Sequence, residues 1–110
     1  MSKGSTELLK GTLDLLILKT LELEPRHGVA IADRLAQITD GTFVVKAGSL
    51  FPALHRLEGE GWIRGEWGET PEGRRARVYT LTTAGRRQLG IEKRNWLRIS
   101  AAMGQVLESE

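Results

Sequence analysis

The amino-acid sequence predicts a mainly helical α+β fold, in which three helices precede one β-hairpin and a fourth helix completes the chain. Two observations lead to this prediction. Leucine and isoleucine recur at helical spacing through the first half of the chain and again near its C-terminus, whereas the residues between these stretches alternate with the two-residue period of strands. The length of 110 residues suits one domain with a single hydrophobic core.

The first two helices are predicted from their apolar spacing. One is expected from near Thr6 to the helix-breaking Pro25. Its apolar stripe comprises Leu9, Leu13, Leu16, Ile17, Leu21 and Leu23. A second, shorter helix is expected to end near Thr39, because the sequence "TDGT" has Asp-Gly turn chemistry. Its core-facing positions are Ile31, Leu35 and Ile38. The next apolar residues, "FVV" at 43–45, are expected to pair briefly as a strand.

The stretch "GSLFPALHRLEGEGWI" predicts a third helix that begins near Gly48 and Ser49 and closes at "GEG", residues 59–61. Ser49 is expected to be its N-cap, which leaves Pro52 in the first turn, where a missing N–H costs little. Leu50, Leu54 and Leu57 cluster on one side, so this side must face the core. The opposite side presents Ser49, Pro52, His55 and Arg56.

A β-hairpin and a last helix are expected after residue 61. The segments "WIRGEW" and "ARVYTL" alternate with period two, and their β-branched and aromatic content favours strands. Between them "GETPEGRR" contains Pro71 and Gly73, which indicates a hairpin with a long tip. Thr82 or Thr83 is expected to be the N-cap of the final helix.

This order of elements is that of a winged helix-turn-helix, in which one helix follows another across a tight turn and a hairpin with a basic tip comes next. In that fold one helix fits the major groove of DNA, while the wing reaches the adjacent backbone or minor groove. We therefore expect residues 1–81 to form a DNA-binding domain. The candidate DNA-contacting residues are Lys46, Ser49, Phe51, Pro52, His55, Arg56, Arg74, Arg75 and Arg77.

Several of these candidates have a structural alternative. Ser49 has the right chemistry for a helix cap alone, and Arg56 is spaced to pair with Glu60 on the next turn. Phe51 lies at the edge of the leucine stripe, where a core role is also open. Taken singly, His55 and Arg56 are equally well explained as solvated surface residues. The order of elements together with the arginine-rich tip is what favours contact with DNA.

The charge distribution is uneven, although the net charge is only +2. Between Arg74 and Arg98, eight basic residues accompany a single acidic residue, Glu92. Such a basic segment suits a polyanionic partner, and it equally suits an ordinary solvated surface.

Other classes of function find little support in the sequence. The absence of Cys excludes disulfides and thiolate chemistry, and the two His residues belong to no catalytic or phosphate-binding motif. We therefore expect no enzymatic activity, no cofactor and no metal site. The longest apolar run, "LLIL", is far too short to cross a bilayer, and the start "MSKGSTELLKG" lacks the apolar core of a secretion signal. A soluble, cytoplasmic protein is expected.

Four blocks of the sequence, in this order, resemble the PadR-like family of bacterial transcriptional regulators: "GTLDLLILKTL", "PRHGVAIADRL", "GSLFPALHRLEGEGWI" and "RRARVYTLTTAGRRQL". The resemblance covers roughly residues 8 to 90. It implies a dimeric winged-helix repressor whose third helix enters the major groove and whose C-terminal helix dimerises. Family members usually have Tyr where this chain has Phe51, and often Tyr where it has Val29, which leaves Phe51 only an apolar or stacking role toward DNA.

The C-terminal segment, residues 82–110, is expected to form a dimerisation helix. Leu89, Trp96 and Met103 repeat every seven residues, which is the spacing of a helix-pairing seam, although Glu92 interrupts it. The expected dimer-interface residues are Leu9, Leu89, Trp96, Ile99, Met103 and Val106. The alternative is that this seam packs on the protein's own first helix. An apolar stripe that projects beyond a small core favours an interface.

These features predict a sequence-specific transcriptional regulator that acts as a homodimeric repressor on an inverted-repeat operator in double-stranded DNA. The alternative is a winged-helix module that binds RNA or another protein. The family resemblance also implies that some relatives respond to small aromatic or lipophilic effectors near the dimer helices. Trp96 and Met103 are the candidate effector-binding residues. The alternative is that two Trp96 rings pack directly on each other without a cavity.

Overall fold

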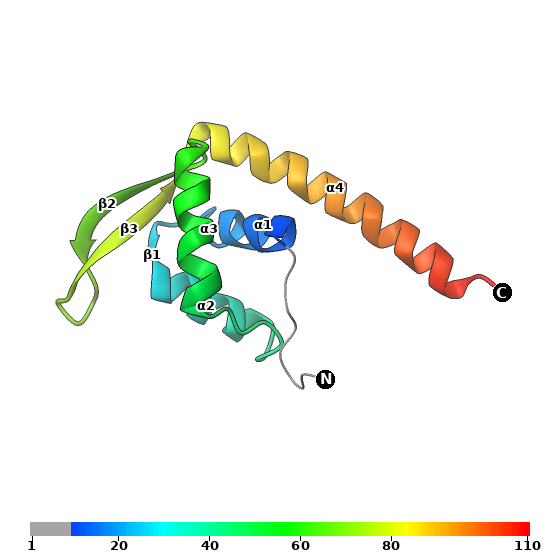
Figure 1. The fold of residues 1–110 in the computed structure, drawn as a ribbon, viewed down its shortest axis with the longest axis horizontal. Helices are drawn as coiled ribbons and strands as arrows, with labels where there is room; N and C mark the ends of the chain where they lie inside the picture. The colour runs from blue at the N-terminus through cyan, green and yellow to red at the C-terminus, as the bar shows by residue number, and fades with distance from the viewer. Residues whose placement is uncertain (1–9) are drawn as a thin grey trace.

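The computed structural model describes residues 10–110 and confirms the mainly helical fold with a small β-sheet wing (Figure 1). In this part of the chain the elements are α1 (Lys10–Thr20), β1 (Arg26–His27), α2 (Gly28–Ile38), α3 (Ala47–Gly59), β2 (Ile63–Glu69), β3 (Arg75–Leu81) and α4 (Thr83–Glu108). The wing of β2 and β3 projects on one side of the helices, and α4 projects on the other (Figure 1). The expected helix start near Thr6, and Leu9, lie outside the described residues.

Helix α1 lies at the centre of the core and contacts α2, α3 and α4. The buried apolar residues are Leu13, Ile17, Leu18 and Leu21 from α1 and the turn after it, Ile31 and Leu35 from α2, Leu50, Ala53, Leu54 and Leu57 from α3, Ile63, Tyr79 and Leu81 from the sheet, and Leu89 from α4. The predicted first stripe is wrong at Leu23, which is 90% exposed. The reason is that α1 ends at Thr20, whose carbonyl accepts a hydrogen bond from Arg26 Nε at 2.9 Å.

The predicted second helix is confirmed as α2, with Ile31 and Leu35 buried. Ile38 is exposed, because it is the last helical residue. The chain then reverses through Asp40 (φ 52°) and Gly41 (φ 84°), a left-handed backbone that Gly adopts without strain.

The segment 43–45 forms no strand, contrary to the expectation. The backbone N–H of Phe43 is already bonded to the Thr39 hydroxyl at 3.0 Å, so the segment continues the turn into α3. The strand that does join the hairpin is β1, which the sequence analysis missed.

Helix α3 begins at Ala47, earlier than expected, with Lys46 as its N-cap. Ser49 is therefore inside the helix and does not cap it. Pro52 lies beyond the first turn, where it cannot donate to the carbonyl of Gly48. Because Gly48 is exposed, water can satisfy that carbonyl.

The two wing strands and β1 form a three-stranded antiparallel sheet with strand order β1-β3-β2. Its register pairs Trp67 with Arg77 and Glu69 with Arg75, and β1 pairs Arg26 with Tyr79. Residues 70–74 form the tip, where the Thr70 N–H donates to the Arg74 carbonyl at 2.8 Å. The strand β1 ties the start of α2 directly to the wing.

Helix α4 starts where the sequence predicts, with Thr82 as its N-cap, accepting from the Gly85 N–H at 3.0 Å. Its first turns pack on the core through Leu89, which is 4% exposed. From Lys93 onward every side chain with a Cβ is exposed, and this half of the helix extends away from the core (Figure 1).

Candidate nucleic-acid interface

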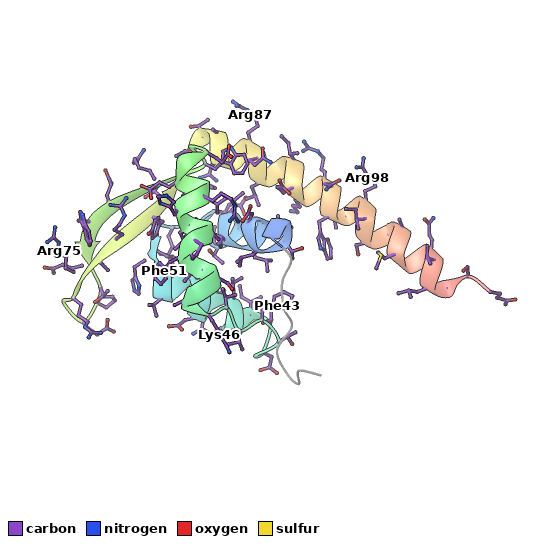
Figure 2. All side chains as sticks on the ribbon, viewed as in Figure 1. Phe43, Lys46, Phe51, Arg75, Arg87 and Arg98 are labelled. Carbon is purple, nitrogen blue, oxygen red and sulfur yellow. The ribbon has the colours of Figure 1, made fainter. Side chains whose placement is uncertain are left out.

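The outer face of α3 carries the polar surface that the sequence predicts. Ser49, Pro52 and His55 are exposed. Lys46 is exposed immediately before the helix (Figure 2). The leucines on the opposite side fix α3 in the core, so the outer face has a set orientation. Hydroxyl and imidazole groups can bond to base edges or phosphate, and a lysine ammonium favours phosphate.

Phe51 occupies a position between core and surface, at 45% exposure. Its ring lies against Gly28 at the start of α2, where an added Cβ would be 2.8 Å from Phe51 Cε1. One edge of the ring is therefore held by α2, and the rest is open on the side of α3 that faces the wing (Figure 2).

Arg56 does not lie on the outward surface, so the prediction that it points outward with Ser49 and His55 is wrong. Its guanidinium forms a hydrogen-bonded ion pair with Asp14 of α1, and the two side chains are only 30% and 13% exposed. The open alternative, a pair with Glu60, is not what forms. Arg56 fastens α3 to α1 across the core edge.

The three wing arginines divide into two groups. Arg74 and Arg75 are exposed at the tip. Arg77 instead donates through Nη2 to Glu58 Oε2 of α3 at 2.6 Å and to the Gly65 carbonyl of β2 at 2.9 Å. Its charge is therefore paired, and it braces the wing against α3.

Trp67 is a residue of this surface that the sequence analysis did not select. Its indole is 60% exposed. The Arg75 guanidinium carbon lies 4.5 Å from the ring centroid, and that of Arg77 lies 5.7 Å away, which are cation–π distances. The signal that could have found it is the strand register that sets Trp67 opposite Arg77, but the register depends on the length of the tip.

A hollow of about 320 Å³ lies between the wing, the start of α2 and Phe51 of α3. We call it the wing hollow, and the residues that line it include His27, Val29, Phe51, Trp67, Arg77 and Tyr79. Its surface is mostly apolar, and its one charged lining group is Arg77. Of the residues expected to contact DNA, only Phe51 and Arg77 line the wing hollow.

A family model described as "Transcriptional regulator PadR-like family" matches residues 17–91, from the middle of α1 into α4. The chain belongs to this family. It is a PadR-family transcriptional regulator with a DNA-binding winged-helix fold.

Individual relatives agree with this assignment. Transcriptional regulator Rv3488 of Mycobacterium tuberculosis is 37% identical over 68 residues, which cover 62% of this chain and 60% of that protein. A PadR family transcriptional regulator from Eggerthella lenta is similar in structure, with a TM-score of 0.78, 30% identity, and coverage of 92% of this chain and 86% of that chain. A PadR-like transcriptional regulator from Bacillus cereus gives a TM-score of 0.79 at 28% identity, covering 96% and 100%.

In this PadR-family chain, the first residue of the predicted seam on α4, Leu89, differs from the residues that follow it in the seam. Leu89 belongs to the core of its own chain, so its assignment to a dimer interface is wrong. Trp96, Ile99, Met103 and Val106 are exposed. Leu89 is thus the only buried residue of the seam on α4, while Trp96 and Ile99 border α1 with about half of their surface exposed.

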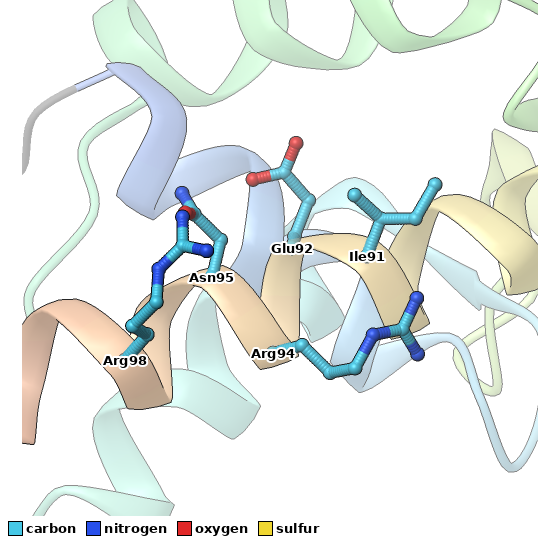
Figure 3. A pocket seen from close by; sticks show the side chains of 5 residues that line it. All are labelled: Ile91, Glu92, Arg94, Asn95 and Arg98. Atoms are coloured by element: carbon cyan, nitrogen blue, oxygen red, sulfur yellow. The ribbon is translucent and has the colours of Figure 1, made fainter.

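Among the residues that the structure describes, α4 borders hollows of two kinds. One, of about 220 Å³, lies between α1 and α4 and is lined by Gly11, Thr12, Leu15, Glu92, Asn95, Trp96 and Ile99. Met103 does not line it in the described structure. The other, of about 470 Å³, is lined by residues of α4 alone: Ile91, Glu92, Arg94, Asn95 and Arg98 (Figure 3). One convex helix does not enclose a ligand, so this second hollow is not a small-molecule site by itself.

One further electrostatic feature lies apart from α3 and the wing. A hydrogen bond from Lys19 lowers the pKa of Glu22, assisted by the charges of Lys93 and Arg86 on α4, so this pair belongs to the junction of α1 with α4.

Within residues 10–110, the acidic and His side chains form no metal-binding cluster. Across the same residues, no helix combines the length and the apolar character that membrane crossing requires.

Proposed function

We propose that this PadR-family regulator is a repressor that binds an inverted-repeat operator as a homodimer. Each protomer would place α3 in a major groove and its wing on the adjacent backbone or minor groove. The observation that carries the proposal is that α3 keeps a polar face exposed, with Ser49 and His55, while the tip of the wing exposes Arg74 and Arg75. Arg74 and Arg75 at the tip form no ion pair with any of residues 10–110 and so supply cations for phosphate. Such a regulator would act in the cytoplasm, where bacterial DNA lies.

The C-terminal half of α4 supports the proposed dimer. Six apolar side chains along it are each at least 47% exposed: Trp96, Leu97, Ile99, Met103, Val106 and Leu107. Burial of apolar surface stabilises an interface by roughly 25 cal/mol per Å². A second α4 related by a twofold axis would cover the same row on both protomers and would set two α3 helices on one side of the duplex.

Selection of bound duplexes from a random DNA pool tests this proposal. Enrichment of an inverted repeat with half-sites ~10 bp apart, or a multiple of that spacing, is the expected result, together with a dimer by analytical ultracentrifugation. A single unpaired motif and a monomer at micromolar concentration would contradict the dimeric repressor. Weak binding to all duplexes, with tight and salt-tolerant binding of RNA or a protein, would instead favour an interaction module.

The hollow between α1 and α4 supports a small aromatic or lipophilic effector. Trp96 and Ile99 line it together with Leu15 of α1, so a planar guest could stack on the indole. In a twofold dimer the site appears twice, and a guest that preferred one angle between the helices would alter operator affinity. Met103 would contact the guest only from the partner's side or across the seam.

The effector is tested by tryptophan fluorescence. Planar aromatic compounds should quench the parent protein, and Trp96→Phe and Trp96→Leu variants should lose most of that quenching, while Trp62 and Trp67 supply the constant background. Quenching that survives both substitutions, or the lack of any compound that shifts operator affinity, would leave a regulator controlled by its abundance.

A further inference from the structure

Glu58, near the end of α3, is hydrogen-bonded to both strands of the hairpin. Its Oε2 accepts from Arg77 Nη2 of β3 at 2.6 Å and from the Gly65 N–H of β2 at 3.3 Å. The same Nη2 donates to the Gly65 carbonyl at 2.9 Å. We call these three residues the wing brace. They join α3 to the wing through one carboxylate.

The wing brace lies where the sheet loses its third strand. Among residues 10–110, β1 pairs with Val78 and Tyr79 of β3, so the hairpin continues from Arg77 and Trp67 to the tip as two strands. This part projects away from the helices (Figure 1). A two-stranded hairpin has little stability of its own. A contact at its base therefore sets the angle at which it leaves α3.

Gly65 makes room for the Arg77 guanidinium. An added Cβ at Gly65 would be 2.5 Å from Arg77 Nη2, which is closer than real Cβ atoms come. Gly68 lies on the other face of the same strand, because side chains alternate along it. An added Cβ there would meet Val78 Cγ2 at 3.0 Å and would be clear of Arg77. The guanidinium is thus seated against a position that has no side chain.

A carboxylate on α3 opposes the binding of DNA, because phosphate repels it. Folding stability accounts for little of its presence. Glu58 and Arg77 are 33% and 34% exposed, and ion pairs with that much solvent contact contribute little to stability. The contribution of the pair is therefore expected in the geometry of the wing.

We propose that Glu58 and Arg77 are positioning residues that hold the wing at one angle to α3 before DNA binds. The proposal rests on the proposed function, in which α3 and the tip of the wing contact the same duplex. Neither residue of the pair touches DNA. A wing that already has its bound orientation loses less conformational freedom on binding, so the wing brace raises the affinity for every duplex.

Removal of the carboxylate distinguishes positioning from repulsion. Glu58→Ala should bind operator and random duplexes roughly fivefold more weakly, because the wing must then be ordered on binding. Repulsion alone predicts tighter binding of both. Glu69→Ala removes the same charge from an exposed site nearer the tip and is the matched control. It should bind at least as tightly as the parent in fluorescence anisotropy titrations of labelled duplexes with the full chain.

A second substitution breaks the wing brace without changing any charge. Gly65→Ala displaces the Arg77 guanidinium, and this end of the side chain is flexible, so the fold should remain. Both duplexes should bind roughly fivefold more weakly, as with Glu58→Ala. Gly68→Ala is the matched control and should bind like the parent. This pair covers the case in which Glu58→Ala fails to fold.

The salt dependence separates positioning from contact. Arg77→Ala should lower affinity by the same factor, while the slope of log affinity against log salt stays that of the parent, since no phosphate contact is lost. Glu58→Ala combined with Arg77→Ala should bind no more weakly than Arg77→Ala alone, because the two residues act as one unit.

Three results would overturn the proposal. They are binding by folded Glu58→Ala as tight as by the parent, equal affinities of Gly65→Ala and Gly68→Ala, and a slope reduced by about 1 in Arg77→Ala. Failure of the parent protein to bind any duplex would instead contradict the proposed function.

Discussion

Helix α3 buries its three leucines at 2% exposure or less, whereas α4 buries Leu89 and leaves its later apolar residues exposed from Ile91 onward. The apolar side of α3 is thus satisfied within one chain, and its other side is free for a polar partner. The projecting half of α4 has no such partition, because its apolar residues have no core to enter. The difference separates a helix whose apolar side is covered within one protomer from a helix whose apolar residues stay exposed there.

The largest expected effect comes from one substitution made in both parts of α4. Gly85 lies at the core, where an added Cβ would be 1.9 Å from the Trp62 carbonyl oxygen, while nothing lies within 4 Å of one at Gly104. Gly85→Ala should lower the free energy of unfolding by about 3 kcal/mol. Gly104→Ala should raise it by about 0.5–1 kcal/mol through helix propensity. Urea denaturation at fixed protein concentration measures both, and equal stabilities would contradict the division of α4 into packed and projecting halves.

Next is the association of protomers through α4. Met103→Asp should weaken dimerisation by at least about 2 kcal/mol, roughly 30-fold, because it places a charge in the apolar row. Circular dichroism should stay that of a folded chain. Leu23→Asp, at an exposed site off this row, is the matched control in sedimentation velocity. If Met103→Asp dimerised like the parent, the exposed face of α4 would not be the interface.

A smaller effect is expected where α3 meets α1. Arg56→Ala should cost about 2 kcal/mol of stability, since it leaves the Asp14 carboxylate without its charged partner. Asp14→Asn should cost a similar amount, and the double variant less than the sum of the two. Glu60→Gln, which removes the partner expected from local spacing, should change thermal unfolding little. A change in base preference without loss of stability in Arg56→Ala would restore it as a DNA contact.

The smallest expected effect is a difference between Arg74 and Arg77 in the salt dependence of DNA affinity. Arg74→Ala should weaken operator and random DNA equally and reduce the slope of log affinity against log salt by about 1, because a free phosphate contact is lost. Arg77→Ala should leave this slope nearly unchanged, since its charge is paired with Glu58. Titrations at several salt concentrations test both, and equal slope changes would show that Arg77 also reaches phosphate.

Local patterns predicted most elements of the fold. The spacing of Leu50, Leu54 and Leu57 placed the buried side of α3, and Thr82 marked the start of α4. Both depend on neighbours within a few residues. Strand β1 escaped prediction because two residues are too few to show a two-residue period.

The predictions for Arg56, Arg77 and Leu89 failed for a different reason. Asp14 lies 42 residues from Arg56 in sequence, and Glu58 lies 19 from Arg77. A partner at that separation is set by tertiary packing, which local spacing does not encode. Leu89 has the heptad spacing of the seam, but a residue at that spacing can pack on α1 of its own chain as well as on a partner helix. For this reason periodicity alone could not separate core from seam.

Only Thr82 lies between β3 and α4. Two hydrogen bonds hold it in place: its N–H donates to the Trp62 carbonyl at 3.1 Å, and its hydroxyl donates to the Gly61 carbonyl at 2.7 Å. This short, hydrogen-bonded connection therefore restricts rotation of the wing relative to α4. In the proposed dimer, one base pair added between half-sites shifts the second site by about 3.4 Å and turns it by about 35°. A dimer with restricted rotation between wing and α4 cannot reorient its second DNA-binding surface by that angle. The length of the operator spacer should therefore be selected as strictly as the bases of the half-sites. Bending of the duplex remains as the means of adjustment.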